Sequence, residues 1–255
     1  MKRITLAAAM ALSLTTSSAL ADTLGGEVAI GGWRHDPSGW ILYPNTDPTA
    51  TRLDVDDDLH LDTQSDLYLR AKFEHPLPIV PNLRLGYVHT ATEGDGQVNR
   101  EFTFGDITFG ASENIHTKTE LDNYDATVYY EVLDTGVDID LGLTLRYMDG
   151  YVTVTSQTTG LEDTADIDFF IPMVYANVRT PVPFLEGLSV GAEGNWIGYD
   201  GSTVFDLQAD VRYTFAMGVG LEAGYRWQKI KLDDVDDTDA DVDLDGFFFG
   251  LVWDF

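Results

Sequence analysis

The sequence contains no cysteine. A disulfide framework, a cysteine-ligated zinc site and a thiol nucleophile are therefore excluded. Positive charge is also scarce, because 15 Lys and Arg stand against 43 Asp and Glu, which gives a formal net charge of -28. Such a chain repels a polyanion, so nucleic-acid binding is excluded as a function. The sequence is nevertheless 44% hydrophobic and 12% aromatic, which is too apolar for an acidic disordered chain and predicts a folded domain.

Catalytic motifs are absent as well. No G-x-S-x-G, H-E-x-x-H or P-loop pattern occurs. A histidine paired with a carboxylate at His89 or His116 would be the basis of a rim enzyme acting on lipid or peptide, which we keep as an alternative. The stretch 35–38 (His-Asp-Pro-Ser) brings a base and a nucleophile together, but in an expected loop that would not position them. We expect no enzyme, and the sequence assigns no catalytic, cofactor-binding or metal-binding residue.

No apolar run of about 18 residues occurs after the N-terminal segment, so membrane-spanning helices are excluded. The N-terminal segment itself has Lys2 and Arg3, then an apolar stretch over 4–14, then small residues that end at Ala21. This order of charge, short apolar run and small-residue cleavage site is typical of a secretory signal peptide. We therefore expect residues 1–21 to be removed and 22–255 to form one domain.

Downstream of the signal peptide, apolar residues alternate with polar or small ones at period 2. In the run over 136–149, for example, Ile139 and Leu141 alternate with Asp140 and Gly142. This alternation is typical of strands with one face in an apolar medium and the other in a polar one, and no segment shows a helical period. Ten runs are expected to be strands: 24–34, 64–75, 82–92, 121–133, 136–149, 166–179, 187–198, 203–216, 218–232 and 243–255.

The connections between these runs alternate between compact links and longer acidic ones. The longer links are expected over 35–63, 93–120, 150–165 and 233–242. Short turns on one side, long polar loops on the other and an even strand number are typical of outer-membrane barrels, whose tilted strands cross an apolar band of about 25 Å in about ten residues. The sequence therefore predicts an all-β, up-and-down antiparallel transmembrane β-barrel in the cell outer membrane of a Gram-negative bacterium, with both termini on the periplasmic side.

The predicted number of strands and the predicted location in a membrane each have an alternative. The segment 101–112 has strand character of its own, so it would either extend a hairpin above the membrane or raise the count to twelve. Eight strands is the smaller alternative. A soluble periplasmic ligand-binding β-barrel, which would purify without detergent, is the alternative that needs no lipid.

The polar face of the predicted strands carries charges of both signs. Ten strands enclose a lumen only slightly wider than that of an eight-stranded barrel, which side chains fill. Buried charges in such a space must pair. We therefore expect ion pairs to block the lumen, with a thin charge-selective path as the alternative. The candidate lumen residues are Arg70, Lys72, Arg84, Arg146, Arg212, Arg226, Glu74, Asp125, Glu131, Asp138, Asp140, Glu193, Asp206, Asp210 and Glu222.

Every second residue of the last predicted strand is large and apolar, which places a row of apolar side chains on one face of the strand. Such a row requires lipid or a protein core, because exposure to water would favour aggregation. It resembles the C-terminal recognition strand of bacterial outer-membrane β-barrels, and the resemblance implies that the barrel-insertion machinery is a partner. Outer-membrane lipid and lipopolysaccharide would then surround the barrel. The residues of this insertion signal are Phe247, Phe249, Leu251, Trp253 and Phe255.

The expected mature N-terminus carries a second resemblance. Gly25 and Gly26 open the first strand. Together with the chain length, the ten-run layout and the terminal Phe255, this pair resembles a family of small proteobacterial outer-membrane β-barrels that lacks an assigned function. The resemblance implies location and architecture, and it supplies no site.

Acidic segments over 54–58 and 233–245 are dense enough in carboxylates to attract divalent cations weakly, although a solvated loop is the simpler interpretation. Asp241, Asp243 and Asp245 match the first half of an EF-hand loop, but Val252 replaces the final glutamate, so we expect no EF-hand. The sequence thus predicts an outer-membrane protein with a structural, surface-interaction or narrow, porin-like transport role.

Overall fold

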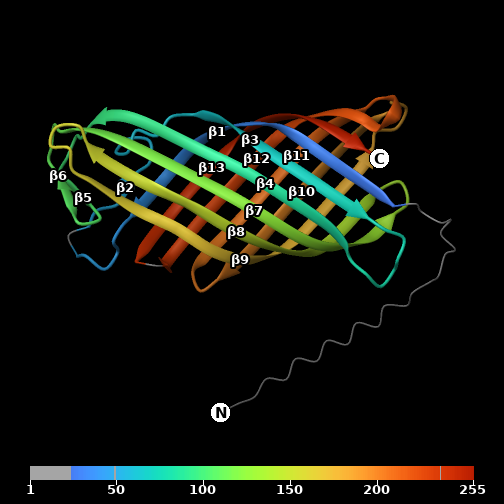
Figure 1. Cartoon of the computed structure of the whole chain (residues 1–255), viewed down its shortest axis with the longest axis horizontal. Coiled ribbons are helices and arrows are strands. Elements are labelled where there is room, and N and C mark those ends of the chain that lie inside the picture. The colour runs from blue at the N-terminus through green and yellow to red at the C-terminus, as the bar shows by residue number, and fades with distance from the viewer. Residues whose placement is uncertain (1–23, 49, 236) are drawn as a thin grey trace, which may run out of the picture.

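Ten long strands close into one antiparallel barrel (Figure 1). The computed structural model describes residues 24–48, 50–235 and 237–255, so the predicted signal peptide over 1–21 lies outside the described residues. Successive strands pair with each other, and pairing of the last strand with the first closes the sheet. The predicted ten-stranded antiparallel barrel is therefore confirmed. Its strands are β1 (Gly25–Leu42), β3 (Gln64–Glu74), β4 (Asn82–Gln97), β7 (Asn114–Asp134), β8 (Asp138–Ser156), β9 (Glu162–Pro181), β10 (Leu188–Tyr199), β11 (Ser202–Thr214), β12 (Val219–Val235) and β13 (Thr238–Asp254).

Both ends of the barrel wall lie together at the end with the short turns. The amide of Gly26 donates to the carbonyl of Phe255 at 2.9 Å. The β7–β8 turn at this end requires Gly136, whose φ of 81° favours glycine. The β11–β12 turn contains the short 3-10 helix η1 (Ala216–Gly218). Within the part of the chain that the structure describes, no helix is long and apolar enough to cross a membrane.

Several strands are longer than predicted, mainly at the opposite end, which carries the long connections and is therefore the extracellular end of a barrel of this kind. The prediction of long loops over 150–165 and 233–242 was wrong, because β8 continues to Ser156, β9 begins at Glu162, and β12 and β13 are separated only by residues 236 and 237. Most of the strands therefore extend beyond the membrane, while β3, β10 and β11 do not.

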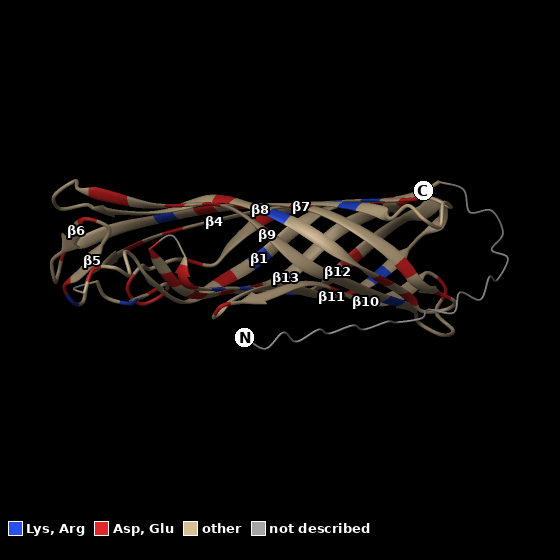
Figure 2. Cartoon of the chain, turned by 90° about the horizontal axis from the view of Figure 1, so that it is seen from below, with Lys and Arg blue, Asp and Glu red and all other residues tan. Residues whose placement is uncertain are grey.

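The polarity of this wall reverses along each strand, and β8 shows the pattern clearly. In its first half, inward Asp140 and Arg146 are buried while outward Leu141 and Leu143 are exposed. In its second half the inward residues are apolar, and the outward ones are polar or amphipathic. These inward residues are Met148, Val152 and Val154, and these outward ones are Asp149, Tyr151, Thr153 and Thr155. Figure 2 shows acidic residues spread over the extracellular end, where β5 and β6 lie.

Two connections fold over the extracellular mouth and form a cap. The connection over 43–63 contains β2 (Leu53–Asp54), and the connection over 98–113 contains the hairpin of β5 (Phe102–Phe104) and β6 (Ile107–Phe109). The segment 101–112 therefore forms a separate hairpin and does not raise the strand count. The cap has its own apolar core with inward residues of the barrel wall, formed by Leu53, Val55, Leu59, Leu61, Val98, Phe102, Phe104, Phe109, Ile115, Val152, Val154 and Ala165.

Exposed apolar side chains surround the half of the barrel that carries the inward charges. Leu143 and Phe249 are 63% and 58% exposed. An aromatic row bounds this belt on the extracellular side, where neighbouring rings from β4 to β9 lie 4.7 to 6.1 Å apart. A closed barrel with an apolar outer band and aromatic girdle is a transmembrane barrel, since lipid is the medium that such a band requires. The ring contacts join Tyr87, Tyr124, Tyr147 and Phe170 in that order.

Candidate functional site in the barrel lumen

The lumen within the membrane is crossed by a network of buried ion pairs. Alternation along the strands turns each member inward from a different part of the wall. Arg70 on β3 donates to Glu27 and Glu222, at 2.8 Å in each case. Arg212 on β11 donates to the same two carboxylates, at 2.6 and 2.9 Å. Two arginines and two glutamates therefore close a ring across the barrel, and Tyr68 donates to Glu222 at 2.8 Å.

A second cluster centres on Arg146, which is completely buried. Its guanidinium forms a two-pronged pair with Asp125, at 2.7 and 2.8 Å, and also contacts Asp206 at 2.7 Å. Arg226 donates to Asp206 from the other side at 2.8 Å. Paired geometry of this kind offsets the large desolvation cost of charges in a barrel interior.

A third group joins these clusters. Arg84 donates to Glu193, which also accepts from Tyr175 at 2.9 Å. Lys72 lies 3.5 Å from Asp140 and 4.0 Å from Glu193. The network thus reaches the wall from β1 through β12.

The free space inside this network is very small. A residual void of about 20 Å³ lies among Arg70, Arg84, Glu193, Asp206 and Arg226. A void of this size holds about one water molecule. The ion pairs therefore fill the cross-section of the barrel.

On the periplasmic side of the network the lumen widens into a vestibule of about 330 Å³. The candidates Glu74, Glu131 and Asp138 line this vestibule and lie below the main network. Glu74 accepts from Tyr129 at 2.8 Å, and Glu131 accepts from Asn82 at 3.2 Å.

Sequence reasoning missed two members of the network, Glu27 and Arg179. Arg179 on β9 pairs with the candidate Asp210 at 2.8 Å. Both residues lie on the charged parity of their strands, so the same alternation that identified the other candidates carried the signal for these two.

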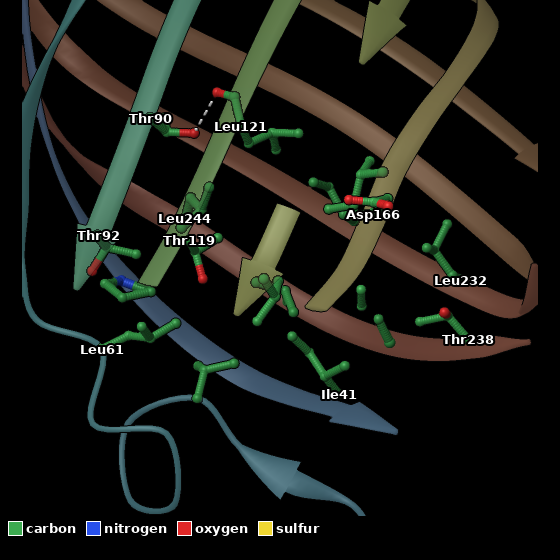
Figure 3. A pocket seen from close by; sticks show the side chains of 18 of the residues that line it. Ile41, Leu61, Thr90, Thr92, Thr119, Leu121, Asp166, Leu232, Thr238 and Leu244 are labelled. Atoms are coloured by element: carbon green, nitrogen blue, oxygen red, sulfur yellow. Dashed lines mark hydrogen bonds between the residues drawn. The ribbon is translucent and has the colours of Figure 1, made fainter. Parts of the chain in front are cut away.

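Above the network the lumen is apolar and contains a cavity of about 120 Å³, which we call the chamber (Figure 3). Leu121 and Leu244 line it from the wall, and Leu61 lines it from the cap. The polar groups at its lining are few. Thr90 donates to the carbonyl of Leu121 at 3.0 Å, and His35 lies beside Asp66 at 2.9 Å.

The histidines that would serve a rim enzyme lie in separate places. His89 contacts Asp122 at 2.8 Å, and His116 contacts Asp95 at 3.0 Å. The two pairs lie six positions apart on the β4–β7 ladder, a separation of about 20 Å, so they do not form one site.

The stretch 35–38 does not form the expected loop. It lies inside β1, where alternation turns His35 inward and leaves Ser38 exposed on the outer face. This base and this nucleophile therefore lie on opposite sides of the wall.

The acidic residues near the C-terminus also belong to a strand. Asp241 and Asp243 lie on β13, and Lys229 of β12 pairs with both. Across residues 24–48, 50–235 and 237–255, no group of three His, Asp or Glu side chains is arranged to hold a metal ion.

One carboxylate joins the cap to the wall. Glu113 accepts from the hydroxyl of Ser156 at the end of β8 and from the amide of Gly110. The two donors stabilise the charged form, so they hold the pKa of Glu113 below its usual value.

No protein-family model matches the sequence, and no curated protein matches it. Among solved structures, Ail, the attachment invasion locus protein of Yersinia pestis, is 10% identical and aligns over 91% of this chain and 98% of its own, with a TM-score of 0.36. The translocator domain of autotransporter NalP from Neisseria meningitidis is 13% identical over 90% and 86%, with a TM-score of 0.40. The P. putida toluene transporter TodX is 7% identical over 90% and 89%, with a TM-score of 0.35.

Proposed function

We propose that this chain is an outer-membrane barrel whose lumen is closed to ions by the buried ion-pair network, and whose role is exerted at its extracellular end. The observation that carries this proposal is the residual void of about 20 Å³ within the network. A hydrated ion cannot pass through a space that holds about one water molecule. The proposal includes no catalytic step.

The outer surface supports the same placement in the membrane. The predicted insertion-signal residues alternate along β13 to the end of the chain, are between 52% and 74% exposed, and therefore meet lipid. We expect the insertion machinery to read this strand and outer-membrane lipid and lipopolysaccharide to surround the barrel. The expected residues are Phe247, Phe249, Leu251, Trp253 and Phe255.

Planar bilayer recordings test the closed lumen. The purified full-length protein is expected to give no steady conductance. The double variant Arg84→Ala/Glu193→Ala removes both members of one ion pair and leaves Lys72 beside Asp140, and it is expected to give a small steady conductance.

A matched double variant outside the network controls for general loosening. Arg100 and Asp58 form an ion pair in the cap, where their side chains lie 2.6 Å apart. Arg100→Ala/Asp58→Ala also removes one complete pair, but it is expected to remain silent because the pair does not line the closed section. A large, steady conductance from the unmodified protein would overturn the proposal.

A further inference from the structure

The chamber is closed above and below but not on every side. The cap covers it with Val55 and Leu61, while the ion-pair network lies beneath it. The wall beside it changes at β10 and β11, which are shorter than their neighbours. This difference in strand length determines how the chamber communicates with the exterior.

The register of the ladder places the tip of the β10–β11 hairpin at the level of the aromatic row. The β9–β10 pairing ends where Trp196 lies opposite Val174, so four positions further along, Asp200 stands at the level of Phe170. Phe170 contacts Tyr147 in the aromatic row, at 4.7 Å between ring centroids. The hairpin therefore ends at the outer boundary of the membrane.

The strands that flank this hairpin continue beyond it. β9 extends from Phe170 to Glu162, and β12 extends past Lys231, the last residue that pairs with β11, to Val235. Among the described residues, the β9–β10 ladder contains no pair beyond Trp196 and Val174, and the β11–β12 ladder contains none beyond Thr203 and Lys231. The wall thus has a notch between β9 and β12, just above the membrane surface.

A surface hollow of about 380 Å³ occupies this notch. It shares Phe169, Leu232 and Val235 with the lining of the chamber. Asp166, which is exposed on β9, also lines the chamber, so the chamber reaches the free edge of that strand (Figure 3). The chamber and the notch are therefore adjacent and share a wall.

We propose that the chamber binds a short alkyl chain, which enters through the notch at the level of the lipid headgroups. The lining is predominantly aliphatic, and buried apolar surface contributes about 25 cal/mol for each Å² removed from water. The volume of about 120 Å³ is of the order of the engineered apolar cavities of about 150 Å³ that bind benzene, so it suits about six carbon atoms. The chain comes either from a free alkanol or from the end of a lipid acyl chain.

Nuclear Overhauser contacts to the chamber methyl groups distinguish these two sources. The full protein, labelled at Leu and Val methyls, is reconstituted in nanodiscs, since a detergent would itself offer alkyl chains. One sample holds deuterated lipid and protonated 1-hexanol, and the other holds protonated lipid without alcohol. Contacts from Leu121 and Val152 to hexanol identify a free solute, and contacts to lipid chains in the second sample identify an acyl chain. The absence of contacts in both samples would overturn the proposal.

Filling the chamber provides the second measurement. Ala240→Leu and, separately, Ala165→Leu place extra carbon atoms at its lining, and each is expected to weaken the contacts at least fivefold. Ala126→Leu adds the same atoms on the lipid-facing side of β7 and is expected to leave them unchanged. Heat-modifiable migration on a gel shows that each variant is folded. Undiminished contacts in both filled, folded variants would also overturn the proposal. The bilayer recordings do not bear on this result, because the chamber lies above the closed section.

Discussion

The membrane half and the extracellular half of this barrel are built from the same strands with opposite polarity. In the membrane half, apolar side chains face outward and paired charges fill the interior. In the extracellular half, polar side chains face outward and the interior is apolar. The medium explains the reversal, because lipid surrounds one half and water the other. The comparison shows that one continuous sheet can hold a charged closure and an apolar chamber in succession.

The largest expected difference between the halves concerns the loss of one arginine. Arg146→Leu leaves Asp125 and Asp206 without their central partner, and it is expected to lower the free energy of unfolding by about 3 to 5 kcal/mol. Arg100→Leu breaks a pair in the cap whose arginine is 47% exposed, and it is expected to cost less than about 1 kcal/mol. Urea unfolding in lipid vesicles measures both values.

A rescue variant tests whether the stranded charges cause this loss. Arg146→Leu/Asp125→Asn removes the carboxylate of the two-pronged pair together with its partner and leaves Asp206 paired with Arg226, so it is expected to recover part of the lost stability. Equal losses for Arg146→Leu and Arg100→Leu would remove the energetic distinction between the network and the cap.

A smaller difference is expected on the outer face of a single strand. Leu143→Arg places a charge in the apolar belt and is expected to cost about 2 to 4 kcal/mol. Thr155→Arg lies on the same face of β8 but in the extracellular half, opposite Glu162, and is expected to change stability by less than about 0.5 kcal/mol. The same unfolding assay compares them. Similar costs at the two positions would mean that the belt ends elsewhere than at the aromatic row.

The reversal also explains which parts of the fold the sequence could predict. The ten strands and their antiparallel order follow from alternation, which is strong wherever leucines face lipid. The extensions were missed because the apolar parity changes at Tyr147 and Met148, so a search for one apolar face ends there. The acidic segment after residue 232 resembles a loop in composition, yet Asp241 and Asp243 face outward while Ala240 and Val242 line the chamber.

The candidate site was predictable to a similar degree. Alternation along the strands alone identified the inward charges. In a membrane barrel, a charged residue that alternates with lipid-facing leucines must face the lumen. Which charges pair depends on strands far apart in sequence, such as Arg212 with Glu27, and no local pattern encodes that distance. The chamber was hidden for the same reason, since its lining comes from the cap and from both sides of the notch.

The smallest expected effect concerns the attachment of the cap to the wall as pH falls. The lowered pKa of Glu113 means that the folded cap favours the charged carboxylate more than the unfolded segment does. The resulting stabilisation is present above the usual glutamate pKa of about 4.3 and is lost as the pH falls through the lower folded value. Proteolysis of the connection over 98–113 is therefore expected to accelerate below about pH 4. Ser156→Ala removes a hydroxyl donor to Glu113 and should weaken this acid dependence, whereas Thr153→Ala, on the outer face of the same strand, should leave it intact. An acid dependence that is unchanged in Ser156→Ala would show that a group other than Glu113 controls the attachment of the cap.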